Sequence, residues 1–183
     1  MTRNLVLSAA LLAATAIASP ATAATLDNAP GSGHGVILSP LTFLNDTNVN
    51  FGEVVLPVGV AGAVQLDPDP SVTNFVTNTG VFPIPSSAPT RGLMIGAGTA
   101  NSLVTITTAF PSKLYLNGNV TSPTSLNVSL NVDSPVTATP DSYDYTIDSA
   151  QAFQVHIGGR VDIPAGTSNG SYSNTYTVTA TYP

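Results

Sequence analysis

The fold is decided by residues 153–182, FQVHIGGRVDIPAGTSNGSYSNTYTVTATY, in which two alternating stretches flank a polar break. In the first stretch the apolar side chains occupy odd positions, namely Phe153, Val155, Ile157, Val161 and Ile163. In the second, threonines alternate with valine, alanine and tyrosine up to Tyr182. A period of two places successive side chains on opposite faces, which is typical of a strand with one buried face. Residues 164–170 are rich in turn formers, so the sequence predicts two strands joined by a loop.

The same alternation recurs in shorter runs along the rest of the chain. It predicts strands at 36–43, 49–55, 62–66, 72–76, 93–95, 102–107, 114–116 and 126–132. The clearest of these is the last, whose apolar positions are Leu126, Val128, Leu130 and Val132. Closely spaced prolines predict a loop over 82–89, and Asn117-Gly118 predicts a tight turn.

These strands define the expected fold class. After residue 23 no long stretch has a helical period, so we expect almost no helix. Short strands separated by Gly, Pro and Asn turns predict an all-β protein, specifically an immunoglobulin-like or Greek-key β-sandwich of about seven to nine strands. A closed barrel is the alternative architecture.

The first 23 residues have the features of an export signal. Arg3 precedes an apolar run, and Ala21-Thr22-Ala23 has the small-residue pattern of a cleavage site. The run is shorter than the roughly 20 residues that a membrane-spanning helix requires. We therefore expect a cleaved signal peptide at 1–23, a flexible N-terminal lead at 24–35 and a single β-sandwich domain at 36–183. The exported protein would reside in the periplasm, on the cell surface or outside the cell.

The net charge excludes some classes of partner, and the lack of cysteine excludes disulfides as a source of stability. Once Arg3 is removed, three basic residues, Arg91, Lys113 and Arg160, stand against ten carboxylates, a net charge of −7. Such a surface repels nucleic acid and anionic membranes, so we expect no nucleic-acid partner and no membrane span. The sequence has no cysteine, so stability depends on burial rather than on disulfides.

Residues suited to catalysis are scarce. His34 lies in the lead and His156 on the polar face of a strand, and neither has an evident partner for acid–base or metal chemistry. Without cysteine or a G-x-S-x-G motif, no nucleophile is indicated. The glycines of Gly96-Ala97-Gly98 precede no helix and therefore indicate a turn rather than a phosphate-binding loop. We expect a protein that is not an enzyme, with no catalytic, cofactor-binding or metal-binding residues.

Two groups of carboxylates leave calcium binding open. Asp67 lies close to Asp69 in the sequence, and Asp141 lies close to Asp144 and Asp148. Ca²⁺ takes about six to eight oxygen ligands, to which such side chains contribute. The run from Asp67 to Pro70 lacks the glycine of a calcium loop, so solvated turn carboxylates are the favoured interpretation.

Several motifs resemble those of an exported bacterial family, the domain of unknown function 4402. They are Phe51-Gly52, Pro57, Gly59 and the strand at 62–66, followed by Ile157-Gly158-Gly159, Pro164-Ala165-Gly166, Gly170-Ser171-Tyr172 and the closing TYTVTATY. The resemblance covers about 36–182, with two departures. Asn174 stands where the family usually has glycine, and residues 93–96 match the family's F-x-V-x-G strand only loosely. The resemblance implies an exported β-sandwich, more distantly similar to spore-coat-U-like and fimbrial subunits.

The sequence therefore favours a structural function. We expect a non-enzymatic, fimbria-like structural or surface-assembly protein whose partners are itself or other exported surface subunits. The alternative is a ligand-binding or adhesive module of the carbohydrate-binding type, which would use the loop at 75–89 and the tyrosines Tyr143 and Tyr145 beside Asp141 and Asp144. The polar lead is a poor strand to donate to another subunit. Either 36–43 is then the donated strand, with Pro40 placing it at an edge, or the sandwich completes itself with 36–43 as its own first strand. The sequence favours the second, because 36–43 is followed by 49–55 after only a short polar turn.

The signal sequence gives a prediction about processing. The exported protein should begin at Ala24, because cleavage follows Ala21-Thr22-Ala23. N-terminal sequencing or intact mass of the exported product measures this directly. An exported protein that retains Met1 would contradict the prediction.

Overall fold

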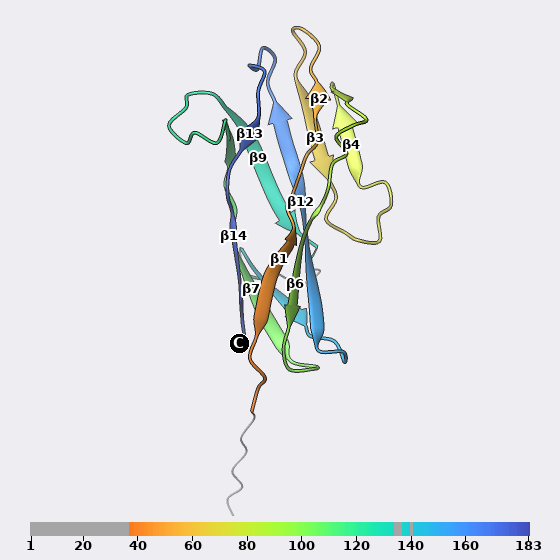
Figure 1. The fold of residues 1–183 in the computed structure, drawn as a ribbon, viewed down its shortest axis with the longest axis vertical. Coiled ribbons are helices and arrows are strands. Elements are labelled where there is room, and N and C mark those ends of the chain that lie inside the picture. Colours follow the sequence, from red (N-terminus) through yellow and green to blue (C-terminus); the bar gives the residue numbers. More distant parts are fainter. Residues whose placement is uncertain (1–36, 134–136, 140) are drawn as a thin grey trace, which may run out of the picture. The chain divides into compact units, whose positions relative to one another are not determined.

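The computed structural model describes residues 37–133, 137–139 and 141–183, and Ile37–Pro183 form one compact unit. No helix occurs among the described residues, so the expected all-β class is confirmed. The expected signal peptide at 1–23 and the expected lead at 24–35, including His34, lie outside the described residues. The described strands, shown in Figure 1, are β1 Thr42–Thr47, β2 Val54–Val55, β3 Gly62–Leu66, β4 Val76–Thr79, β5 Phe82–Pro83, β6 Gly92–Ala97, β7 Leu103–Ala109, β8 Lys113–Leu116, β9 Ser125–Val132, β10 Thr137–Thr139, β11 Ser142–Thr146, β12 Ala152–Ile163, β13 Tyr172–Ser173 and β14 Thr177–Thr181.

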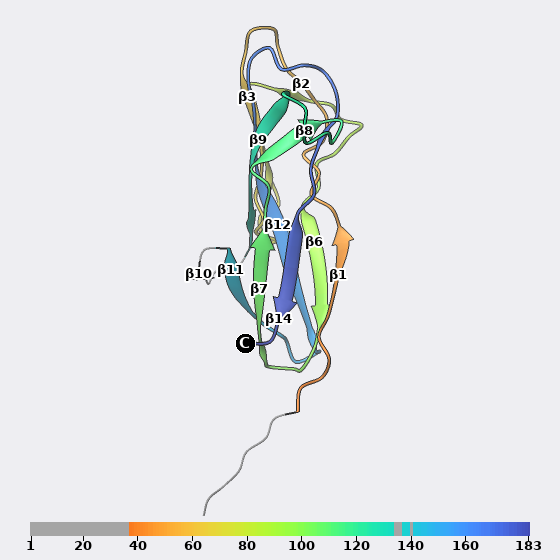
Figure 2. The same ribbon diagram turned by 90° about the vertical axis from the view of Figure 1, so that its left-hand side faces the viewer.

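The strands form a β-sandwich. Within the described residues, the larger sheet has the order β1-β6-β12-β9-β8-β13, with β3 paired to β12 and β4 to β3. The smaller sheet has the order β10-β11-β7-β14, and β2 pairs separately with β5. Figure 2 shows β7 and β14 in front of β6 and β12, and buried residues from both sheets share one cluster. The strands outnumber the seven to nine expected because some are only two residues long, such as β2, β5 and β13.

β12 is the central strand of the larger sheet, because it pairs with three other strands, β3, β6 and β9. Its first part, 152–157, pairs with β6, while its second part pairs with both β3 and β9. Ile157 is opposite both Gly92 of β6 and Val132 of β9, so those two strands lie on opposite edges. β6 and β3 therefore follow one another along the same edge of β12. The predicted buried face is confirmed, since Phe153, Val155, Ile157, Val161 and Ile163 are at most 8% exposed.

The buried side chains form two clusters along β12. The odd-numbered residues of its first part join a cluster between the two sheets, which includes Val104 and Ile106 of β7. Its later odd-numbered residues join a second cluster with Val64 of β3 and Leu126 of β9. One alternating strand thus supplies both cores, and each buried branched side chain contributes about 1.5–3 kcal/mol relative to an exposed one.

Gly158 and Gly159 lie where β12 exchanges β6 for β3. A Cβ at Gly158 would collide with the Leu66 carbonyl oxygen and lie 2.7 Å from the nitrogen of Pro68. Gly159 has a φ of +147°, and a Cβ there would collide with the carbonyl oxygen of Ser129. The Gly-Gly pair therefore lets the backbones of β3 and β9 approach β12 closely, a role that requires glycine.

The first strand starts later than the sequence predicted. β1 begins at Thr42, whereas alternation predicted a strand over 36–43, and residues 37–41 lie outside the strands. Pro40 has no backbone N–H to donate to a ladder, which accounts for the later start. The strand is nevertheless supplied within the chain, because β1 pairs antiparallel with β6.

Two expectations in the middle of the chain also need correction. The predicted loop at 82–89 contains β5, whose Pro83 is tolerated because β5 pairs only with β2. The strand expected at 72–76 is displaced to β4, Val76–Thr79. The turn at Asn117-Gly118 is confirmed, since both residues have positive φ, at 55° and 67°.

The C-terminal alternating stretch is divided between the two sheets. β13 pairs with β8 in the larger sheet, whereas β14 pairs with β7 in the smaller one. Residues 174–176 connect the two, although the alternation of the sequence continues through them. The chain therefore crosses the edge of the sandwich here.

The Gly-Gly junction gives a prediction about stability. Gly159→Ala should lower the free energy of unfolding by about 3 kcal/mol or more, because a backbone collision and a strained φ cannot be relieved by moving a side chain. Gly166→Ala is the control, since Gly166 also has a positive φ, of +77°, but a Cβ there would have no atom within 4 Å. It should cost only about 1–2 kcal/mol. Urea unfolding followed by circular dichroism measures both, and equal losses would contradict the assigned role of Gly159.

Candidate functional site

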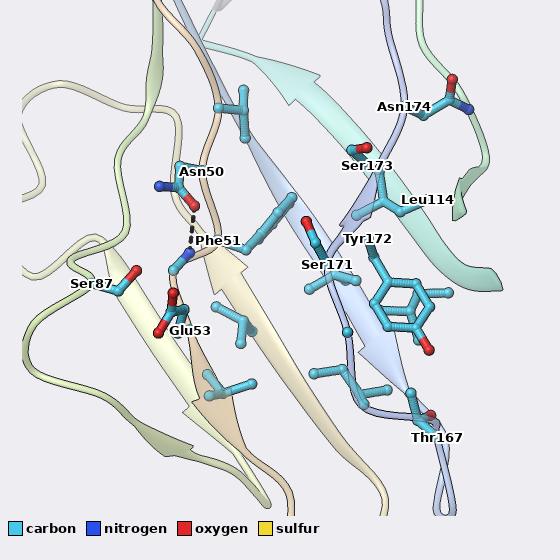
Figure 3. A pocket seen from close by; sticks show the side chains of 18 of the residues that line it. Asn50, Phe51, Glu53, Ser87, Leu114, Thr167, Ser171, Tyr172, Ser173 and Asn174 are labelled. Atoms are coloured by element: carbon cyan, nitrogen blue, oxygen red, sulfur yellow. Dashed lines mark hydrogen bonds between the residues drawn. The ribbon is translucent and has the colours of Figure 1, made fainter. Parts of the chain in front are cut away.

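An open slot lies between two segments that are far apart in the sequence. One wall is the chain from β1 to β2, and the other is the chain from residue 167 through β13 to β14. The slot has an upper part of about 690 Å³ and a lower part of about 520 Å³. Val49, Asn174 and Tyr176 line both parts, so the two adjoin. Figure 3 shows the upper part, with Asn50 to Glu53 facing Ser171 to Asn174.

The floor of the upper part is apolar. It is formed by side chains of β3, β9 and β12, namely Val64, Leu126, Leu130, Val161 and Ile163. Most of these belong to the second core cluster, which is covered by Phe51 and Val54 from one wall and by Tyr172 from the other. The two covering segments leave the slot between them, above core side chains that are themselves at most 8% exposed.

Both walls present strand edges that lack a partner within the described residues. In the lower part β1 pairs only with β6, and β14 pairs only with β7. In the upper part Asn50 exchanges both backbone hydrogen bonds with Thr90, at 2.9 and 2.8 Å. Because backbone groups alternate in direction along an extended chain, those of Val49 and Phe51 point to the opposite side, towards the slot. The slot thus combines an apolar floor with exposed backbone edges.

Local sequence explains the shape of each wall. Gly52 has a φ of +77°, and its N–H donates a hydrogen bond to Oδ1 of Asn50 at 2.9 Å. A Cβ at Gly52 would lie 2.7 Å from the Ser87 carbonyl oxygen, so the Phe51-Gly52 motif allows a close chain approach. On the other wall Asn174 replaces the usual glycine, and its Nδ2 donates to the carbonyl oxygen of Lys113 at 2.9 Å.

Tyr176 lies where the two parts of the slot meet. Its ring contacts Phe110 edge-to-face, with centroids 5.8 Å apart, and its hydroxyl comes within 3.3 Å of a Cβ placed on Gly92. The hydroxyl is buried, and the backbone of Val49 is the group close enough to act on it. Burial raises the pKa of Tyr176, and a hydrogen bond with the Val49 backbone lowers it by a smaller amount. The hydroxyl is therefore held in the interior by one wall of the slot.

The predicted absence of a partner for His156 is wrong. The His156 ring Nδ1 lies 2.7 Å from Oδ2 of Asp133, and the backbone N–H of His156 donates to Oδ1 at 3.1 Å. The hydroxyl of Tyr145 donates to the same carboxylate at 2.7 Å. Asp133 follows β9 in the larger sheet, whereas Tyr145 belongs to β11 in the smaller one, so the cluster links the two sheets. Sequence could not indicate it, because the partners come from three separate segments.

The first group of carboxylates considered for calcium, Asp67 and Asp69, accepts hydrogen bonds from residues two positions later in the chain. Asp67 Oδ1 accepts the N–H of Asp69 at 3.0 Å, and Asp69 Oδ1 accepts the hydroxyl and N–H of Ser71 at 2.7 and 2.9 Å. These bonds from Ser71 lower the pKa of Asp69. Among the residues with described positions, no group of three His, Cys, Asp or Glu side chains is arranged to hold a metal ion.

The second set of carboxylates and the neighbouring tyrosines do not form an exposed platform. Asp144 Oδ1 accepts the Thr105 hydroxyl at 3.0 Å, and Asp148 Oδ1 accepts the N–H of Ala152 at 2.9 Å. Tyr143 and Tyr145 pack partly buried against the first core cluster. Part of each ring therefore contributes to the core, which leaves less of it exposed than the sugar-binding interpretation requires.

Comparison with family models identifies the class of protein. A model described as "Domain of unknown function (DUF4402)" matches residues 41–182, nearly the whole compact unit. The chain therefore belongs to this family, as its motifs predicted. Searches of curated proteins and of solved structures found no match. In the part of the chain that the structure describes, no helix has the length and apolar character needed to cross a membrane.

The Asp133 cluster gives a prediction about stability. Asp133→Ala should lower the free energy of unfolding by about 2 kcal/mol, because the Tyr145 hydroxyl and the His156 ring lose a buried acceptor. Asp46→Ala is the control, since Asp46 is exposed and accepts only the neighbouring Thr47 hydroxyl at 3.1 Å. That change should stay within about 0.5 kcal/mol. Urea titration of both variants measures the difference, and equal effects would show that the cluster is not a structural link.

Proposed function

We propose that this protein is a non-enzymatic, exported structural subunit of a surface assembly, and that its slot receives an extended strand from another polypeptide. The observation that supports this most is the slot itself, with an apolar floor and two unpaired edges. β-Augmentation uses these features, because the edges bind the backbone of an added strand and apolar pockets take its alternate side chains.

The slot changes one expectation drawn from the sequence. Self-completion was favoured because the chain provides its own first strand, and β1 does pair with β6. However, an open space of about 690 Å³ remains between the two walls after every described strand is in place. Another chain in this space would cover the partly buried apolar side chains of the walls, such as Phe51, Val54 and Tyr172, at about 25 cal/mol per Å² of apolar surface removed from water.

A ligand-binding or adhesive module is the second candidate. Its support is the upper part of the slot, since about 690 Å³ lies within the size range of small-molecule sites, roughly 300–1,000 Å³. Polar groups on the rim, including Glu53, Ser171 and Asn174, would orient such a ligand. The slot extends into a second part along unpaired strand edges, which suits a polypeptide better than a compact ligand.

The assembly proposal predicts an effect of charge in the slot. Leu44→Asp should greatly reduce self-association or partner binding, because Leu44 lines the lower part and an inserted strand would have to bury the carboxylate. Leu103→Asp is the control, because Leu103 is similarly exposed, 51% against 57% for Leu44, but does not line the slot. Both variants should fold, as shown by unchanged circular dichroism. Sedimentation velocity of the exported protein measures association.

Two results would contradict the proposal. If both variants associate as the wild type does, the slot is not used in assembly. If wild-type protein is monomeric and electron microscopy shows identical cell surfaces with and without it, the structural function fails. Saturable binding of a small sugar that Leu44→Asp leaves unchanged would instead favour the adhesive module.

A further inference from the structure

We propose that Asn169-Gly170 is a modification site, at which Asn169 deamidates spontaneously and adds a carboxylate to the wall of the slot. The chain contains this dipeptide twice, at Asn117-Gly118 and at Asn169-Gly170. Both pairs are exposed, but their hydrogen bonding differs. The effect of the new charge on an inserted strand rests on the proposed function, whereas the reaction itself does not.

Deamidation of an asparagine that precedes glycine needs only water and hydroxide. The backbone nitrogen of Gly170 loses its proton to hydroxide and forms a bond to Cγ of Asn169, while the bond from Cγ to Nδ2 breaks and Nδ2 leaves as ammonia with a proton from water. Water then opens the cyclic imide at one of its carbonyl carbons and breaks the bond from that carbon to the Gly170 nitrogen. The products are aspartate and isoaspartate, and each carries a new carboxylate. Glycine favours ring closure because it has no Cβ beside the attacking nitrogen.

The backbone nitrogen of Gly170 is available for this attack. Asn169 and Gly170 are exposed and lie outside the strands. Among the described residues, neither the Gly170 N–H nor the Asn169 side chain has a hydrogen-bond partner. Position 170 also requires glycine, since its φ is +152° and a Cβ there would collide with Cδ1 of Leu116. The fold therefore keeps a residue without a side chain next to an asparagine that is not held in place.

The other pair, Asn117-Gly118, is protected by the turn that it forms. The Gly118 N–H donates to the carbonyl oxygen of Tyr115 at 3.0 Å, and the Asn117 N–H donates to that of Ser171 at 2.7 Å. Attack by the Gly118 nitrogen requires the loss of the first bond and a rotation of the backbone that the second bond opposes. The same dipeptide therefore occurs in a resistant and in a susceptible environment within one chain.

Deamidation of Asn169 changes the charge of the slot, because Asn169 lines its upper part. Figure 3 shows Thr167 and Ser171, which lie two positions before and after Asn169 in the chain, on the wall that faces Glu53. Glu53 is the only charged residue among the described residues that line the upper part. A second carboxylate makes the slot less suited to an apolar strand, since the occupant would remove part of the hydration of that carboxylate.

The reaction is measured independently of assembly. Wild-type protein is held in mildly alkaline buffer, and peptide mapping by mass spectrometry follows both asparagines over time. Deamidation of Asn169 should be at least about tenfold faster than that of Asn117, because Asn117 reacts only after hydrogen bonds are lost. In urea that unfolds the protein, the two rates should become similar. Folded protein in which Asn169 reacts no faster than Asn117 overturns the modification site and leaves the proposed function standing. A difference that persists in urea overturns the structural explanation.

Two substitutions of Asn169 test the effect on the slot. Asn169→Asp reproduces a product of the reaction, and Asn169→Gln is its uncharged counterpart. Both should fold, as checked by circular dichroism, because the Asn169 side chain is exposed and holds no described neighbour. In sedimentation velocity Asn169→Asp should associate up to about fivefold more weakly than Asn169→Gln, the range expected for an exposed charge. Equal association of the two variants overturns the effect on the slot and leaves the proposed function standing. If wild-type protein does not associate either, the proposed function and the effect on the slot both fail, whereas the measured deamidation of Asn169 stands.

Discussion

The close approach of three backbones at Gly158 and Gly159 is the constraint on which this fold depends. β12 must pair with β6 over its first part and with β3 and β9 over its second; the change from β6 to β3 occurs at the two glycines, and pairing with β9 begins just before them, at Ile157. A side chain at either position would meet the backbone of β3 or β9. Without this junction, one strand could not supply buried residues to both clusters.

The slot is a consequence of the same junction. Where β3 replaces β6, the chain before β6 is hydrogen-bonded at Thr90 to Asn50, and the neighbouring Phe51 and Val54 cover the second core from one side. Arg91, which directly precedes β6, holds this chain against the segment that follows β3. Its guanidinium donates to the carbonyl oxygens of Asp67 and Val72 at 2.5 and 2.6 Å. It also lies 4.2 Å from the ring centre of Phe75, a cation–π contact. The cover from the other side comes from β13, and the two covers do not meet.

Sequence predicted the parts of the fold that depend on local alternation. The buried faces of β12, β9 and β7 follow directly from a period of two, and the Asn117-Gly118 turn follows from its residue types. The crossing of the chain between sheets at 174–176 could not be predicted, because threonine and tyrosine continue to alternate through it. The slot and the Asp133 cluster were missed for a different reason. Each is formed by segments far apart in the sequence, and no local pattern records which segments meet.

The hydrogen bonds of Tyr182 have a consequence for how the domain can be combined with others. The Tyr182 hydroxyl donates to Ser39 and accepts the N–H of Thr99 at 2.8 Å, so the two ends of the folded unit are fastened at one place. Domains with adjacent ends can be inserted into a loop of a host protein without separating their own strands. The unit is therefore suited to insertion into a surface loop of another protein, because both of its ends can be joined to the host at one place.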